Sequence, residues 1–114
     1  MPEAAEFLAG FGFVKGTRFA GYILVNAMAS HESISRYQEY KYHLTLVFQK
    51  AGLSDYISLY NAVANNFSQE HIIYGIRNPY RCIIDHPVHG DITEDDDGTV
   101  TFKLTGHSYR VYKH

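Results

Sequence analysis

The chain has 114 residues, of which 46% are hydrophobic and 19% charged, and its formal net charge is −2. This length and composition fit one folded domain with a modest core and exclude an intrinsically disordered chain. The near-neutral net charge also differs from that of most proteins that bind nucleic acid unaided, which are strongly basic.

Cysteine usage and the N-terminus indicate where the chain resides. A single cysteine, Cys82, excludes an intrachain disulfide and a four-thiolate metal site. It lies in the apolar run YRCII, where we expect a small buried side chain and a reducing, cytoplasmic location. The start, MPEAAEF, has no basic stretch followed by an apolar one, so we expect no signal peptide. No apolar run approaches the length of a membrane span, so we expect no membrane partner.

The first two thirds of the chain show apolar residues at helical spacing. The first segment is rich in Ala, Glu and Leu, and serines suited to helix capping precede the last three segments. Glycine or proline follows several of them, as is typical of helix ends. The sequence therefore predicts five helices, at residues 3–10, 17–29, 31–50, 55–66 and 69–77.

After Pro79 the apolar residues alternate instead. Val100, Phe102 and Leu104 are separated by polar residues, which is typical of a strand, and Asp97-Gly98 is a turn signal. Shorter strands are expected at 80–85 and 108–113. The sequence thus predicts an α+β fold, in which an N-terminal bundle of about five helices precedes a small antiparallel β-sheet. We expect a single domain, 1–114, with a helical part, 1–78, and a β-hairpin extension, 79–114.

The stretch LYNAVANNFSQEHIIYGIR, residues 59–77, forms most of a helix-turn-helix-like segment expected at 55–77. GFVKGTRFAGYIL, residues 12–24, resembles the opening of the C-terminal DNA-binding effector domain of the Firmicute sporulation master response regulator. LYNAVANNF resembles the scaffold helix of that domain, and IIYGIR resembles its recognition helix. The resemblance implies that Leu59–Ala64 form the scaffold helix and that 69–77 enter the major groove.

This resemblance implies a small DNA-binding regulator of bacterial or phage origin. It places Arg77 at a matched basic position, whereas Glu70, Ile73 and Tyr74 replace expected DNA contacts, and the tail 79–114 has no counterpart. A helix-turn-helix this small usually dimerises on a two-fold DNA site, so the partners would be double-stranded DNA and a second copy of the chain. The residue types suited to bases and phosphates are Lys15, Arg18, Gln69, His71, Arg77, Asn78 and Arg81.

The acidic run EDDD, residues 94–97, supports an alternative function. Its simplest interpretation is a solvated hairpin tip, and it does not fit a calcium loop because Leu104 occupies the position of the final glutamate ligand. A third interpretation is an acidic surface that binds a basic partner or mimics nucleic-acid phosphate. The alternative is therefore a phage or mobile-element inhibitor that binds a host nucleic-acid-handling complex. Its expected contacts are Tyr74, Tyr80, Glu94, Asp95, Asp96 and Asp97.

The histidines do not establish a catalytic or metal site. DHPVHGD, residues 85–91, has residue types that bind zinc, but a turn explains the same residues, so we expect no metal and no cofactor. HLTL, residues 43–46, matches half of a two-histidine phosphoesterase pattern, and the chain contains no second half. We therefore expect a non-enzyme.

Overall fold

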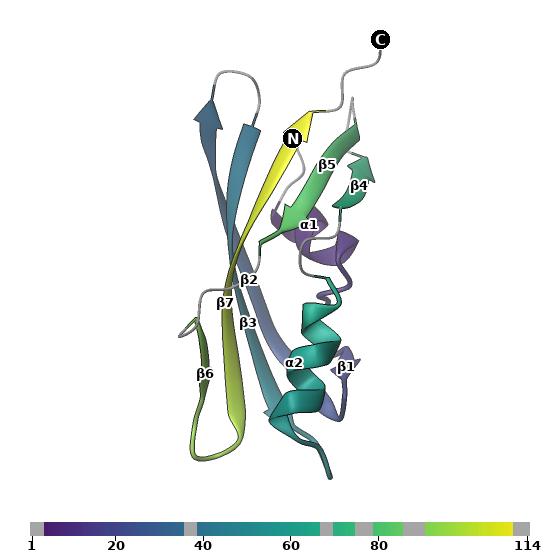
Figure 1. Cartoon of the computed structure of the whole chain (residues 1–114), viewed down its shortest axis with the longest axis vertical. Helices are drawn as coiled ribbons and strands as arrows, with labels where there is room; N and C mark the ends of the chain where they lie inside the picture. Colours follow the sequence, from purple (N-terminus) through teal and green to yellow (C-terminus); the bar gives the residue numbers. More distant parts are fainter. Residues whose placement is uncertain (1–3, 36–38, 67–69, 75–78, 86–90, 111–114) are drawn as a thin grey trace.

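A computed structural model of the chain describes residues 4–35, 39–66, 70–74, 79–85 and 91–110. Within these residues, seven strands form one antiparallel sheet against which two short helices pack (Figure 1). In chain order the elements are α1 (Ala4–Gly10), β1 (Arg18–Phe19), β2 (Tyr22–Ser35), β3 (Glu39–Lys50), α2 (Tyr56–Ala64), β4 (Glu70–Tyr74), β5 (Pro79–Ile84), β6 (Ile92–Glu94) and β7 (Thr99–Arg110). The predicted five-helix bundle followed by a sheet is therefore wrong.

The C-terminal strand lies inside the sheet. The strand order is β1-β2-β3-β7-β5-β4, and β6 pairs with the part of β7 that β5 does not reach. The expected separate strands around 97–106 and 108–113 are largely one strand, β7, which pairs with β3 over ten residues. The segment after residue 79 thus completes the sheet and is not a hairpin appended to a helical body.

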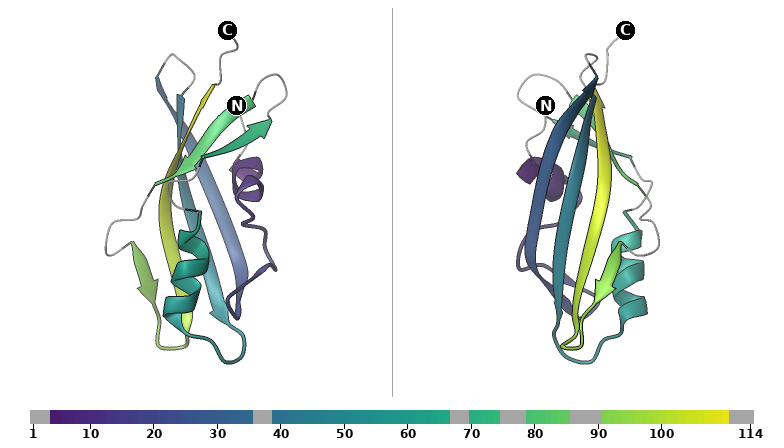
Figure 2. Two further views of the ribbon diagram at one scale, coloured as in Figure 1. Left: turned by 45° about the vertical axis from the view of Figure 1, so that its right-hand side comes forward. Right: turned by 90° about the vertical axis from the view of Figure 1, so that its left-hand side faces the viewer.

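The sheet curls into a half-barrel. Its long strands β2, β3 and β7 twist around a concave side that holds α1 and α2, and β4 and β5 cross over the same side (Figure 2). The molecule is elongated, with principal extents of 50 × 23 × 19 Å. Side chains on the concave side form the core, and the opposite, convex face carries mainly polar side chains together with the exposed Met28.

The helix predicted at 31–50 is wrong because the period of the apolar residues in β3 is two. Tyr42, Leu44, Leu46 and Phe48 are all buried, and the residues between them face the convex side. This alternation is what a half-buried strand requires. Leu44 and Phe48 are four residues apart, a spacing that places two residues on the same face of a helix and also on the same face of a strand.

The helix predicted at 17–29 is also wrong, and a β-bulge explains why its strand pattern is hidden. Tyr22 and Leu24 are buried, but the register with β3 shifts between Leu24 and Asn26. The inward positions then become Ala27 and Ala29, which pack against the core cluster. One inserted residue thus moves the apolar residues from even to odd positions and breaks the period-two signal.

The expected recognition helix at 69–77 is a strand in its described part. Residues Glu70–Tyr74 form β4, which pairs with β5 from Glu70 opposite Ile83 to Tyr74 opposite Pro79. Ile and Tyr favour strands, and the pairing with β5 determines the conformation here. Only the scaffold half of the helix-turn-helix is helical, so the described residues contain no helix-turn-helix.

Two of the predicted helices are present, near the expected bounds, as α1 and α2. Asp55, and not the expected Ser54, caps α2: its Oδ1 accepts a hydrogen bond from the Ser58 amide at 2.7 Å. Leu59 and Val63 form the buried face of α2. Neither of these described helices has the length and apolar character required to cross a lipid bilayer.

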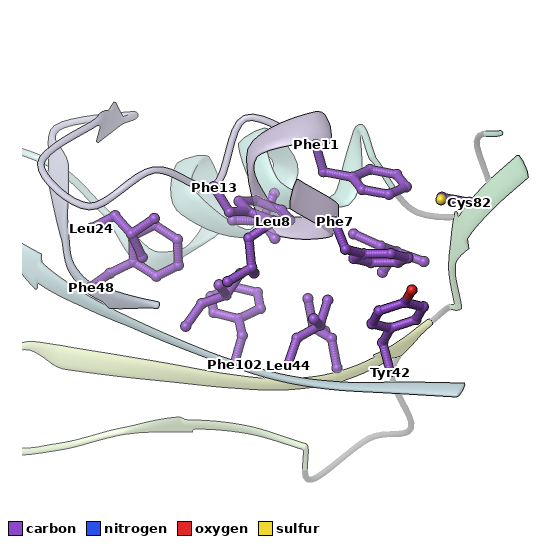
Figure 3. Packing of buried hydrophobic residues seen from close by; sticks show 14 of the residues in the cluster. Phe7, Leu8, Phe11, Phe13, Leu24, Tyr42, Leu44, Phe48, Cys82 and Phe102 are labelled. Atoms are coloured by element: carbon purple, nitrogen blue, oxygen red, sulfur yellow. The ribbon is translucent and has the colours of Figure 1, made fainter. Parts of the chain in front are cut away.

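Aromatic rings fill the core between the sheet and the N-terminal segment (Figure 3). Phe48 makes edge-on contacts with Phe19 and with Phe102, both at a centroid distance of 5.5 Å. Phe13 packs on Phe19 at 5.9 Å, and Cys82 is buried at the other end of the cluster. The predicted burial of Cys82 is confirmed, and burial raises the pKa of its thiol to about 12.

Candidate functional site

The basic residues considered for DNA contact do not gather on one element. Lys15 and Arg18 are exposed near β1, whereas Arg81 is exposed on β5, and strands β2, β3 and β7 separate β1 from β5 in the sheet. His71 lies in strand β4. Gln69, Arg77 and Asn78 lie outside the described residues.

Tyr80 and the acidic residues considered for protein contact differ in exposure. Tyr80 is only 5% exposed and its ring packs on Tyr40 at a centroid distance of 6.3 Å. Tyr74 has its backbone in β4. All four acidic residues, Glu94–Asp97, are exposed. Of these candidate contacts, the acidic turn is therefore accessible to a partner and Tyr80 is not.

The acidic turn has the predicted hairpin geometry. Asp95 and Gly98 make backbone hydrogen bonds that close the turn, and Gly98 has a φ of 86°. The Asp97 carboxylate accepts a hydrogen bond from the Thr99 amide at 3.0 Å, which lowers the pKa of Asp97. The turn is thus a defined structure that holds its carboxylates in solvent.

Two large apolar side chains lie at the same end of the molecule as the acidic turn. Leu53 is fully exposed, and Ile57 is 69% exposed on the side of α2 opposite Leu59 and Val63. The turn that carries Leu53 and the turn between β6 and β7 both lie at the lower end in Figure 1. A Cβ added to Gly98 would lie 3.5 Å from Lys50, the last residue of β3 and three residues before Leu53.

We call this surface the tip and define it as Leu53, Asp55, Ile57 and Glu94–Asp97. Its carboxylates come from two different segments, and both segments act on Tyr22. Burial raises the pKa of Tyr22, and the nearby charges of Glu94 and Asp55 raise it further. Glu94 also raises the pKa of Tyr56, after the larger effect of burial. The tip therefore combines exposed apolar side chains with five exposed carboxylates, beside the exposed Lys50.

Hydrogen bonds to the neighbouring β1–β2 turn hold the tip. The Gly21 carbonyl accepts from the Ala51 amide at 2.9 Å and from the Ser54 hydroxyl at 3.3 Å. Gly21 has a φ of 83°, and an added Cβ would lie 2.6 Å from that of Ser54. Glycine is therefore required where the two turns meet.

The sequence contains a signal for the tip that belongs to no motif. Leu53 follows Gly52 and precedes the capping residue, so it belongs to a turn and not to the apolar face of α2. Ile57 is two residues before Leu59, which places it on the other side of the helix. Large apolar residues in such positions, beside acidic residues, indicate a contact surface.

A second cluster of polar residues lies on the convex face. His43 on β3 contacts the Glu32 carboxylate at 3.2 Å, and His107 on β7 contacts Asp85 at 3.1 Å. The Thr105 hydroxyl donates to the same Asp85 carboxylate at 3.0 Å. In these pairs each histidine and each carboxylate already has a hydrogen-bond partner, on a face that is open to solvent.

The convex cluster does not form a metal centre. Among the described residues, no three His, Cys, Asp or Glu side chains converge as they would around an ion. His86 and His89 of the 85–91 stretch lie outside the described residues. The tip, whose apolar side chains have no structural role in the core, is therefore the stronger candidate site.

Comparison of the chain with protein-family models, curated proteins and solved structures finds no match.

Proposed function

We propose that the chain is a non-enzymatic binding protein whose tip docks onto a basic surface of a nucleic-acid-handling protein and blocks it. One observation carries this proposal: Leu53 and Ile57 are exposed, and the turn that carries Leu53 lies at the same end of the molecule as the acidic turn, so that two segments of the chain supply five exposed carboxylates there. These carboxylates belong to Asp55, Glu94, Asp95, Asp96 and Asp97.

The two components of the tip have different roles in the proposed contact. Burial of a Leu or Ile side chain contributes about 1.5–3 kcal/mol, so Leu53 and Ile57 supply the affinity of a small apolar centre. The carboxylates supply charge complementarity, which speeds association and selects a basic partner. Surfaces that bind phosphate carry clustered Lys and Arg, which is the charge pattern that an acidic tip matches.

The local structure favours binding because the tip is already largely ordered before a partner binds. The capped N-terminus of α2 fixes Ile57, and the hydrogen bonds that Ala51 and Ser54 donate to the Gly21 carbonyl fix the turn that carries Leu53. Immobilising a flexible side chain or loop on binding costs free energy, and a turn held in advance avoids part of that cost.

The proposal is tested by affinity capture followed by measurement with the purified target. The bait proteins are the wild type, a Leu53→Ser/Ile57→Ser variant, and a Glu94→Gln/Asp95→Asn/Asp96→Asn variant. Lys103→Ser is the matched control, since Lys103 is exposed on β7 away from the tip. We expect a protein that the wild type and the control capture, that both tip variants lose, and that heparin or duplex DNA displaces. With the purified target, each tip variant should raise Kd by about tenfold or more.

Two results would contradict the proposal. The first is that the tip variants and the wild type capture the same proteins with equal yield. The second is direct, salt-sensitive binding of the chain itself to duplex DNA, measured by fluorescence anisotropy and weakened by Arg18→Ala or Arg81→Ala. That result would favour the nucleic-acid hypothesis by a route other than a helix-turn-helix.

A further inference from the structure

The outer edge of β2 is open along half of its length. β1 pairs only with Tyr22 and Ile23, and the backbone groups of Leu24 bond to Gly16 and Thr17. Beyond Leu24, no hydrogen bond between the described residues reaches the outer edge of the segment Asn26–Glu32. Every second residue of this segment directs its N–H and C=O groups away from β3, as in any antiparallel edge strand.

This open segment lacks a lysine, a proline and an internal bulge; its one acidic side chain is Glu32, at its end, and α1 packs against β2. Natural edges carry Lys, Pro or a bulge within the exposed run. Asn26–Glu32 has neither Lys nor Pro, and it lies between two register shifts, at Leu24/Asn26 and at Ser33/Ser35. Its centre is small and apolar: Ala27 and Ala29 face inward, and Met28 faces the convex side with 52% of its surface exposed.

We propose that β2 pairs antiparallel with β2 of a second copy of this chain, around a two-fold axis at Ala29. This register uses the whole open segment, because Asn26 and Glu32 are equally far from Ala29. It places Ala29 opposite its copy, Met28 opposite Ser30, and Ala27 opposite His31. A two-fold interface of this kind closes after two copies. It covers the β2 edge of each copy, so no further copy can add at that edge to form a fibre.

Charge complementarity supports a second copy in this orientation. Glu32, at one end of the segment, has an exposed carboxylate that contacts His43, and Lys41 lies opposite it in β3. At the other end the chain carries exposed Lys15 and Arg18, on either side of the two residues that bond to Leu24. Antiparallel pairing brings the acidic end of each copy to the basic end of the other, whereas parallel pairing would bring like charges together.

The dimer has a consequence for the tip. β2 begins at Tyr22, beside the turn that contacts Ser54, so the tip lies beyond the N-terminal end of β2. Antiparallel pairing therefore points the two tips in opposite directions, and the dimer presents two separate contact surfaces. The inference itself does not depend on what the tip binds.

The first test is the molar mass in solution together with a cross-link. We expect wild-type chain to show twice the mass of one copy by light scattering at high concentration. Ala29→Cys should form a disulfide-linked dimer under mild oxidation, since paired residues across antiparallel strands have Cα atoms about 5.5 Å apart, within disulfide range. Lys103→Cys, exposed on strand β7, is the control. Its cross-linking rate in the folded protein should not exceed its rate in urea, where the chain is unfolded. Cys82 is buried in both variants.

The second test exchanges the charges at the two ends. Glu32→Lys alone, and Lys15→Glu with Arg18→Glu alone, should each raise the dimer Kd about tenfold, and the combined variant should recover most of the loss. Rescue distinguishes the interface from simple loss of folding. A single-copy mass at every concentration, with Ala29→Cys cross-linking no faster than Lys103→Cys, would overturn the proposal. Dimerisation that is unaffected by the charge variants would overturn the proposed register.

Discussion

Phe7 of α1 stacks on Tyr42 of β3, with ring centroids 4.1 Å apart and ring planes inclined by 21°. Both side chains are fully buried, and the Ser108 hydroxyl donates a hydrogen bond to the Tyr42 oxygen at 3.3 Å. This contact joins the short N-terminal helix to the middle of the sheet (Figure 3). It holds α1 on the concave side although α1 has only seven residues, too few for a stable isolated helix.

The Phe7 contact requires glycine at position 106. A Cβ on Gly106 would lie 2.7 Å from the Phe7 ring and 2.8 Å from the Ile83 carbonyl oxygen. We expect Gly106→Ala to lower the free energy of unfolding by about 1–3 kcal/mol, measured by urea denaturation. Lys103→Ala on the exposed face of the same strand should change it by less than about 0.5 kcal/mol. Adding Phe7→Leu to Gly106→Ala should cost less than the sum of the two single changes; strict additivity would show that the ring is not what the Cβ meets.

The β1–β2 turn contains a strained residue. Ala20 has a φ of 49°, in the left-handed region that favours glycine, and Gly21 follows with a φ of 83°. Two consecutive positive φ values are typical of a type I′ turn. We expect Ala20→Gly to raise the free energy of unfolding by about 1 kcal/mol, because relief of strain outweighs the added freedom of the unfolded chain. Ala51→Gly, at a position without positive φ, should not stabilise; equal gains from both changes would refute the explanation.

Stability should fall at alkaline pH because two buried groups resist ionisation. Burial raises the pKa of Cys82 from 9.0 to about 12, and burial is also the main reason that the pKa of Tyr42 rises from 10.0 to about 12. Both groups are neutral when protonated, so the folded state favours the protonated form. Their contribution is complete below pH 9 and is lost as the pH rises toward 12.

The alkaline effect is measured by urea midpoints at several values between pH 7 and pH 11.5. Tyr42→Phe removes one titrating group and should flatten the decline relative to wild type. At pH 8 a thiol reagent should modify Cys82 only after urea is added. Rapid modification of the folded chain at pH 8 would show that Cys82 is accessible and would contradict the assigned burial.

The cap of α2 should make stability sensitive to acid. The hydrogen bonds from Ser58 lower the pKa of Asp55, and the charge of Lys50 lowers it further. A carboxylate whose pKa is lowered on folding stabilises the protein above its unfolded pKa, and this stabilisation is lost as the pH falls through the folded value. We expect Asp55→Ala to lower the melting temperature at pH 6 and to do so much less at pH 3. Asp96→Ala, in the exposed turn, is the control; an equal loss at both pH values for Asp55→Ala would exclude the carboxylate as the cause.

The reliable sequence predictions were those that depended on local chemistry. The α2 helix has a capping residue and apolar residues four apart, Leu59 and Val63, so its pattern survives in the fold. The Asp97-Gly98 turn was found because only a few residue types adopt positive φ there. The alternation of Val100, Phe102 and Leu104 identified the centre of β7, and all three side chains are buried.

The failed predictions concern segments whose conformation depends on partners distant in sequence. β2 carries a bulge that interrupts its alternation, and β4 has its pairing partner in β5. The resemblance to a DNA-binding effector domain rested partly on residues 12–24 and 72–74, where the described structure has turns and strands. Of the expected DNA-contact residues, Gln69, Arg77 and Asn78 lie outside the described residues, so the DNA-contact set stays a prediction.

The sequence by itself determined the local features of this protein: the capped helix, the acidic Asp-Gly turn, the buried cysteine and the alternating strand β7. Tertiary structure alone decided that β1, β2 and β3 are strands, that β7 lies between β3 and β5, and that the turn before α2 lies at the same end as the β6–β7 turn. The physical reason is that capping and turn formation depend on residues within a few positions of each other. Strand pairing and the assembly of a surface depend on contacts between segments far apart in the chain, such as the hydrogen bond between Tyr42 and Ser108, which are 66 residues apart.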